Sequence, residues 1–229
     1  MTTFTLLELR RGKVRPLGPK GVSSGIFKER VEGALKATPD GLEGDEQGDR
    51  RHHGGPEKAL HAYPACHYAA WAGELPEQAE LFRPGAFGEN LVVGGLSEED
   101  LCLGDRWSLG GCLLEVSQGR QPCWRLNLRF GRRDMARLVQ QSGRSGWYFR
   151  VLRAGVLQAG DVGHLEARPN PRWTIQRTTT LLYRDCLNQA ALAEFAALPG
   201  LPESWRQLAE KRLSSGQTED WSRRIETPA

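Results

Sequence analysis

The pattern of apolar residues changes once along this chain, at a segment that contains Pro169 and Pro171. Before that segment, short runs rich in β-branched and aromatic residues are bounded by glycines, which is typical of strands joined by turns. After it, apolar residues recur at helical spacing over three segments of helix length. The sequence therefore predicts a mainly β domain with some helices over residues 1–168, a separable three-helix module over 173–214 and a polar tail over 215–229.

The first part carries runs with the composition of strands at residues 3–10, 91–93, 106–109, 112–117 and 147–155. Two glycines between the third and fourth runs predict a hairpin. A single amphipathic helix is indicated over residues 132–142, where a glycine ends it. Many short strands with occasional helices favour a barrel or a sandwich over a doubly wound α/β sheet.

Charge and hydropathy limit the surroundings in which the protein is expected to work. No stretch approaches the roughly 18 apolar residues of a membrane helix. The charges of Glu8, Arg10 and Arg11 interrupt the place where a signal peptide carries its apolar core, so we expect a cytoplasmic protein that does not bind membranes. The net charge is only +3, so we also expect no specific nucleic-acid binding.

Positive charge is nevertheless concentrated between Gly119 and Arg153. This stretch holds nine arginines, no lysine and one acid, Asp134, which gives a local charge of 9 − 1 = +8. We expect some of these arginines to pair with the acidic run at residues 40–49. The others are suited to a pocket for a phosphate or another planar anion, because a guanidinium binds two oxygens at once.

The segment 49–64, DRRHHGGPEKALHAYP, combines two adjacent histidines with two glycines and a proline. The glycines and the proline predict a tight turn whose backbone amides are available as donors. The spacing of the four histidines between residues 52 and 67 matches no zinc motif. Two interpretations stay open: a turn whose histidines only cap and hydrogen-bond, or an anion-holding loop that uses Arg51 and Lys58.

The five cysteines contain no CxxC pair, which argues against a disulfide scaffold, a zinc knuckle and an iron-sulfur cluster. Cys123 lies between Arg120 and Arg125, and neighbouring cations lower the pKa of a thiol and favour the thiolate. We therefore interpret Cys123 as a nucleophile or a metal ligand, with simple packing as the alternative. Packing is the interpretation for Cys102, Cys112 and Cys186.

Four motifs in this order resemble the motifs of MOSC-domain proteins of the YiiM type. They are RRHHGGPEKALHAYP at 50–64, FGENL at 87–91, SQGRQPCWRLN at 117–127 and QQSGRSGWYFRVL at 140–152. The C-terminal segments LLYR, AALPGLPESWR and KRL resemble the three-helix extension of that group. The resemblance implies a MOSC β-barrel with a few flanking helices, followed by a small C-terminal three-helix module.

The resemblance also implies that the protein binds molybdenum cofactor, with Cys123 as the molybdenum ligand. A soft thiolate suits a metal that is already held by the dithiolene of the pterin. The cofactor-binding residues expected from the resemblance and from the anion-loop interpretation are Arg51, His52, His53, Gly54, Gly55, Lys58, Asn90, Arg120 and Arg144.

The activity that the resemblance implies is the reduction of small N-hydroxylated substrates, such as N-hydroxylated bases, to amines. A histidine is a plausible proton donor for this step, and we prefer His53 over His52. The chain has no GxGxxG after a strand, no P-loop and no cysteine spacing for an iron-sulfur cluster. Electrons are therefore expected to come from a separate protein, most simply a flavoprotein reductase.

Two other classes of function stay open from the sequence. Cys123 could carry sulfur as a persulfide in the maturation of molybdenum cofactor, with no metal bound. Alternatively, the protein could be a noncatalytic scaffold whose three-helix module binds a partner, in which case changing Cys123 would have no effect on its function.

Overall fold

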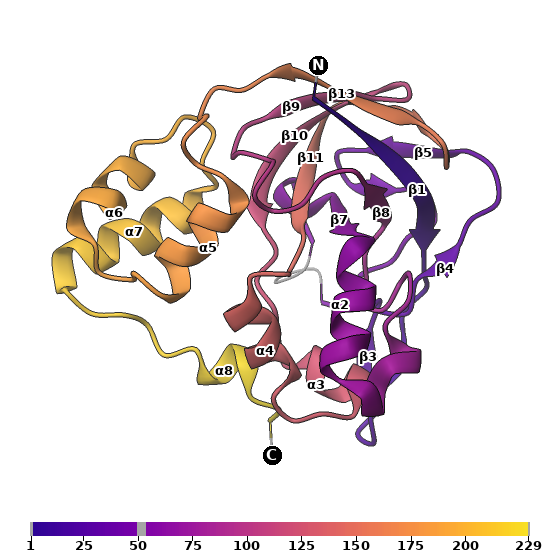
Figure 1. Cartoon of the computed structure of the whole chain (residues 1–229), viewed down its shortest axis with the longest axis horizontal. Helices are drawn as coiled ribbons and strands as arrows, with labels where there is room; N and C mark the ends of the chain where they lie inside the picture. The colour runs from indigo at the N-terminus through magenta and orange to yellow at the C-terminus, as the bar shows by residue number, and fades with distance from the viewer. Residues whose placement is uncertain (1, 50–53, 229) are drawn as a thin grey trace.

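The computed structural model describes residues 2–49 and 54–228. Its centre is a closed barrel of seven strands (Figure 1). Around the barrel, each strand pairs with the next in the order β1 (Thr3–Arg11), β13 (Val162–Ala167), β9 (Arg106–Leu109), β10 (Cys112–Gly119), β11 (Trp147–Arg153), β7 (Leu60–Pro64) and β8 (Leu91–Gly94), which returns to β1. Neighbours are antiparallel except β7 and β8. The predicted β-barrel is confirmed.

Smaller elements surround the barrel. The strands among them are β2 (Arg15–Leu17), β3 (Val22–Ser24), β4 (Glu29–Arg30), β5 (Leu35–Thr38), β6 (Gly41–Leu42) and β12 (Gly155–Leu157). The helices among them are η1 (Pro56–Lys58), α2 (Cys66–Glu74), η2 (Pro76–Leu81), α3 (Arg125–Phe130) and α4 (Met135–Ser142). None of the helices in the described ranges is long and apolar enough to cross a membrane.

Aromatic side chains fill the interior of the barrel. Phe4 packs edge-on against Trp107 with 5.1 Å between the ring centroids, and Trp147 packs against Phe149 in the same way at 6.2 Å. These four rings come from three strands, β1, β9 and β11, and all four are buried. Inward-facing residues that fill a small barrel make it a packed core with no channel, so ligands must bind at its ends or on its outside.

Three C-terminal helices follow the barrel: α5 (Ile175–Tyr183), α6 (Gln189–Ala196) and α7 (Glu203–Ser215). The side chains of Thr174 and Asn188 cap the first two helices by accepting from backbone amides. The predicted three-helix segment is confirmed, but its apolar side chains, among them Trp173 and Trp205, belong to the same buried cluster as the barrel interior. The helices therefore share one core with the barrel.

The chain after α7 turns back to the barrel (Figure 1). The sequence predicts only a polar tail here, whereas the structure contains a short helix, α8 (Ser222–Ile225), next to α3 and α4. Ile225 is buried in a second apolar cluster with Leu126 and Met135. A four-residue helix gives no periodic signal, so its docking becomes visible only in the folded chain.

Candidate functional site

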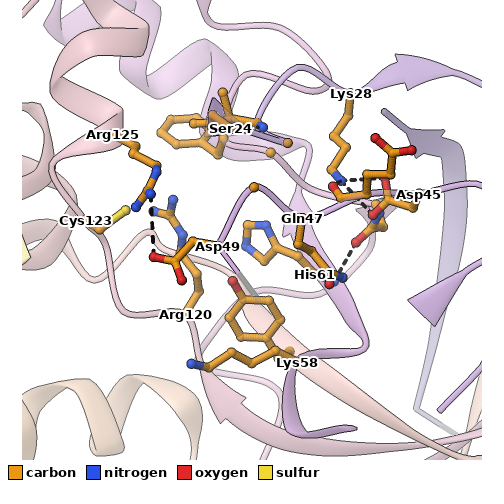
Figure 2. A pocket seen from close by; sticks show the side chains of 18 residues that line it. Ser24, Lys28, Asp45, Gln47, Asp49, Lys58, His61, Arg120, Cys123 and Arg125 are labelled. Atoms are coloured by element: carbon orange, nitrogen blue, oxygen red, sulfur yellow. Dashed lines mark hydrogen bonds and ion pairs between the residues drawn. The ribbon is translucent and has the colours of Figure 1, made fainter. Parts of the chain in front are cut away.

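A pocket opens at the end of the barrel where β10 ends and β8 and β11 begin. Figure 2 shows the side chains that line it, which come from segments far apart in the sequence. These segments are residues 24–28, 45–49, 58–61, 87–90, 120–125 and Tyr148. Barrel ends collect loops in this way, because the packed interior leaves no room for a ligand.

Cys123 lies in the turn between β10 and α3 and is 7% exposed. The turn is held from both sides: the amide of Leu126 donates to the carbonyl of Cys123, and the amide of Trp124 donates to the carbonyl of Arg224 in α8. The negative charge of a Cys123 thiolate acts on both Lys58 and Tyr148. The thiol therefore lies within electrostatic range of groups on η1 and β11.

Arg120 extends from the end of β10 into the pocket (Figure 2). It is 8% exposed, and within the described residues its buried Nη1 has no hydrogen-bond partner. Burying a hydrogen-bond donor without an acceptor costs about 1–3 kcal/mol, and the cost is larger when the donor is charged. An anion in the pocket would satisfy this atom.

Lys58 reaches the pocket from η1, which follows the two glycines of the predicted turn. Gly55 has a φ of 91°, a conformation that favours glycine and directs the chain into η1. Burial lowers the pKa of Lys58, and the charges of Asp49 and Cys123 oppose this shift in part. Asp49 also lies 3.5 Å from Arg125 in an ion pair.

His61 of β7 faces the pocket as a neutral ring. Burial, followed by the positive charge of Arg120, lowers the pKa of His61 to about 3. Its Nε2 is 3.2 Å from the carbonyl oxygen of Ser145, and a carbonyl only accepts, so Nε2 carries the hydrogen. The ring also packs at 5.1 Å from the ring of Tyr148.

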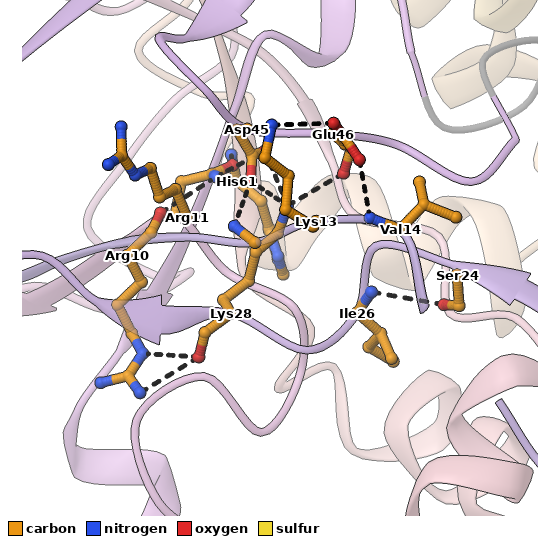
Figure 3. Close-up of polar contacts among 12 residues, drawn as sticks. Arg10, Arg11, Lys13, Val14, Ser24, Ile26, Lys28, Asp45, Glu46 and His61 are labelled. Carbon is orange, nitrogen blue, oxygen red and sulfur yellow. Dashed lines mark hydrogen bonds and ion pairs between the residues drawn. The ribbon is translucent and has the colours of Figure 1, made fainter. Parts of the chain in front are cut away.

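A buried ion pair closes the far side of the pocket. Lys28 Nζ lies 2.5 Å from an Asp45 carboxylate oxygen, and the two side chains are 5% and 4% exposed. Asp45 also accepts from the amide of Gly12 and from the side chain of Asn90, and neighbouring Glu46 accepts from Lys13 (Figure 3). The carboxylates of Asp45 and Glu46 therefore bind groups of residues 12–28 and of Asn90, and none of these bonds involves Arg120.

Comparison with known proteins identifies the family of this chain. The MOSC domain family matches residues 49–162, and the YiiM-like, 3-alpha helix domain family matches residues 173–216. Protein YiiM of Escherichia coli is 40% identical over 96% of this chain and 97% of its own length. The chain belongs to the YiiM-type MOSC proteins.

Two further relatives support the assignment to the YiiM-type MOSC proteins. The crystal structure of Escherichia coli YiiM matches this structure with a TM-score of 0.80 and 37% identity, covering 94% of this chain and all of that one (100%). A Gibberella moniliformis protein named Reductase is 36% identical over 92% of this chain, which spans 37% of that longer protein. MOSC domains are associated with binding of molybdenum cofactor.

The pocket of this MOSC barrel contains four of the residues expected from the sequence, namely Lys58, Asn90, Arg120 and Cys123. Gly54 and Gly55 precede η1 and do not line the pocket. Three other expected residues, Arg51, His52 and His53, lie outside the described residues. Their roles stay predictions.

Arg144 is a further expected residue that lies outside this pocket. It forms an ion pair with Glu74 at 2.5 Å, and its guanidinium lies 3.9 Å from the ring centroid of Trp71. It does not line the pocket. Of the same arginine-rich stretch, Arg125 pairs with the acidic run, whereas Arg150 pairs with glutamates elsewhere.

Sequence reasoning did not assign Lys28, Asp45, His61 and Tyr148 to this pocket. His61 and Tyr148 fall within quoted motifs, so the motifs held a signal for them. Asp45 lies in the acidic run, but no local pattern links it or Lys28 to the pocket, because the two residues pair with each other only in the folded chain.

The described residues fit an anionic cofactor that brings most of its own metal ligands. Within the described ranges, no group of three or more His, Cys, Asp or Glu side chains is placed to hold a metal ion, and Cys123 is the one cysteine among the described residues that line the pocket. The unpartnered Nη1 of Arg120 and the desolvated Lys58 offer positive charge beside it. Asn90 is occupied differently, since its amide bonds to His61, Arg10 and Asp45.

Proposed function

We propose that this protein is a molybdenum-cofactor-dependent oxidoreductase that reduces small N-hydroxylated compounds, such as N-hydroxylated bases, to amines. The observation that carries the proposal is the buried Nη1 of Arg120, which has no partner among the described residues and lies in the same pocket as Cys123. An anion-binding guanidinium next to a single thiol suits a cofactor that carries both a phosphate and a thiophilic metal. The family membership and the relative named Reductase also support it.

The residues of the chain have separate tasks in this proposal. Cys123 is the metal ligand, and Arg120 and Lys58 bind the phosphate and the pterin. Asn90 and the neutral His61 keep the pocket wall in place through their hydrogen bonds to Asp45 and Ser145. When bound, the cofactor supplies a metal centre that exchanges two electrons.

The reaction consumes two electrons and two protons, converts R–NH–OH to R–NH2 and releases water. With a pKa of about 3, His61 is uncharged near neutral pH and is unsuited to donate a proton. His53, which lies outside the described residues, remains our proposed donor. Because the chain has no dinucleotide or flavin motif, the electrons come from a separate protein, proposed to be a flavoprotein reductase.

The proposal is tested with protein produced in a host that makes molybdenum cofactor. We expect stoichiometric molybdenum and pterin, and turnover of an N-hydroxylated base with reduced viologen but not with NAD(P)H alone. Adding a flavoprotein reductase should restore turnover with NAD(P)H. Cyanide-labile sulfur on Cys123 without molybdenum would instead identify a sulfur carrier and contradict the proposal.

A further inference from the structure

A second hollow lies beside the pocket and is lined by five arginines. This arginine groove is open, has a volume of about 420 Å³, and contains Arg10, Arg15, Arg30, Arg83 and Arg129. Lys28 borders both hollows. On α3, Arg125 lines the pocket and Arg129, one helical turn later, lines the arginine groove.

Three of the five guanidiniums already have carboxylate partners. Arg10 pairs with Glu8, Arg15 pairs with Glu29 at 2.5 Å, and Arg30 pairs with Glu32 at 3.3 Å. The groove walls contain just the first two of these carboxylates, Glu8 and Glu29.

Arg83 and Arg129 are the exceptions, because neither forms an ion pair within the described residues. The Nε of Arg129 is buried without an acceptor in that part of the chain, and its guanidinium lies 4.8 Å from the ring centroid of Phe27. Burial lowers the pKa of Arg129 and the nearby charge of Arg83 lowers it further, whereas the more weakly acting charge of Glu89 raises it. Arg83 and Arg129 thus line the same groove, and neither is paired with a carboxylate in the part of the chain that the structure describes.

The backbone is shaped to keep a third guanidinium in place. Gly85 has a φ of 86°, and a Cβ there would lie 2.7 Å from Arg10 Nε and 2.6 Å from the carbonyl oxygen of Lys28. That carbonyl accepts from Arg10 Nε at 3.3 Å and from Nη2 at 3.1 Å (Figure 3). A side chain at position 85 would therefore displace Arg10, which indicates a fixed wall.

We propose that the arginine groove binds the phosphoryl oxygens of a phosphorylated small molecule, at a site separate from the Cys123 pocket. Guanidiniums bind phosphate through two parallel hydrogen bonds. Among the described residues, Arg83 and Arg129 have no carboxylate partner, and the groove carboxylates Glu8 and Glu29 pair with Arg10 and Arg15. A recess with a partly buried guanidinium fits a compact anion better than the flat surface of a protein partner. The phosphoryl group can belong to a free inorganic anion or to a nucleotide.

The test is calorimetric titration of the full-length protein with inorganic pyrophosphate. It is made in an Arg120→Gln background, so that the Cys123 pocket does not contribute its own anion binding. We expect binding to remain in Arg120→Gln and to weaken roughly tenfold or more when Arg83→Gln or Arg129→Gln is added. Arg83 is exposed, so Arg83→Gln gives a variant whose folding is not at risk.

Arg106→Gln is the matched control, since Arg106 lies on the barrel wall in an ion pair with Glu115. Equal affinity in Arg83→Gln, Arg129→Gln and Arg106→Gln would overturn the proposal, as would loss of all binding in Arg120→Gln alone. Repeating the titration with a nucleoside diphosphate identifies the source: tighter binding than pyrophosphate indicates a nucleotide, and equal binding indicates the inorganic anion. The outcome does not depend on whether the protein is a reductase.

Discussion

At the scale of single residues, the pocket is defined by groups that burial has modified. Within the ranges that the structure describes, Arg120 keeps a buried nitrogen without a partner, Lys58 is desolvated, and His61 is held neutral. A folded chain retains such costly groups where a ligand restores what burial removes.

Cys123→Ser is expected to abolish retention of molybdenum and the proposed reduction, because a serine hydroxyl is a poor ligand for a thiophilic metal. The midpoint of thermal unfolding of the cofactor-free protein should change little, since the two side chains are similar in size. Cys102→Ser is the control: Cys102 is 1% exposed, and its variant should lower stability but leave molybdenum content unchanged in the folded fraction. Active Cys123→Ser protein would refute the ligand assignment.

Arg120→Lys is expected to lose pterin on dialysis, because lysine keeps the charge but not the fork of donors. Arg144→Lys should retain the pterin, since Arg144 contacts Glu74 and Trp71 outside the pocket. Its cost should appear as about 1 kcal/mol of stability from the weakened stacking on Trp71. Pterin fluorescence of the denatured protein measures both variants, and equal losses would assign Arg144 to the cofactor site after all.

His61 is expected to make the protein less stable in mild acid. The pKa of His61 is about 3 in the folded state against an ordinary value of 6.5. Below pH 6.5 the unfolded chain therefore binds a proton that the folded chain does not, and the free energy of unfolding decreases as the pH is lowered. Between pH 6.5 and about pH 5 this loss amounts to ~2 kcal/mol. Urea unfolding should show that His61→Asn lacks this part of the pH dependence, and parallel curves for the two proteins would contradict the prediction.

At the scale of elements, the turn that carries Cys123 is held by a helix roughly 100 residues further along the chain. Arg224 of α8 donates to the carbonyl of Pro122 and to the side chain of Gln140, each at 2.5 Å. Its own carbonyl accepts from the amide of Trp124 at 2.7 Å. The residues on both sides of Cys123 therefore depend on α8 for their position.

Arg224→Ala is expected to raise the rate at which iodoacetamide alkylates Cys123 in the cofactor-free protein by roughly tenfold. The reason is that Cys123 is buried, and a turn that has lost its contacts with α8 opens more often to the reagent. Arg223→Ala is the matched control, because Arg223 is the exposed neighbour on the same helix. Alkylation of Cys123 is followed by mass spectrometry of peptides. Equal rates in the two variants would show that α8 does not control the turn.

At the scale of the whole molecule, the barrel and the three helices form one unit. The amide of Leu103 donates to the carbonyl of Trp173, and the amide of Ile175 donates to the carbonyl of Leu101. The start of α5 is therefore hydrogen-bonded to the segment that connects the barrel strands β8 and β9. Ile175 and Trp205 also lie directly over Gly119 at the end of β10. These contacts argue against the separable module that the change in sequence pattern suggests.

Ending the chain at Arg168 is expected to lower the midpoint of thermal unfolding by roughly 10 °C or more, because exposing the apolar face under the helices costs several kcal/mol. Circular dichroism at a strand wavelength measures the transition, with the full-length protein as the reference. A shortened chain that unfolds at the same temperature would restore the separable module.

Local signals in the sequence determined the fold class and part of the site. Short glycine-bounded strands and, later, helical periodicity depend on residues close together in the chain, so a barrel or sandwich of short strands and the three helices could be predicted. The resemblance to MOSC-domain proteins then implied the barrel. The same holds for Cys123 between Arg120 and Arg125. The strand at Leu60–Pro64 was missed, because it is buried on both faces and therefore shows no alternation.

Only the tertiary structure decided which side chains share the pocket. No local pattern assigns Lys28, Asp45 or His61 to the pocket, since their burial and their partners depend on segments that meet when the barrel closes. For the same reason Arg144 belongs with Trp71 and not with Arg120, and the expected polar tail supports the Cys123 turn. Periodicity reports which face of an element is buried, whereas the identity of the neighbour is set by packing between distant parts of the chain.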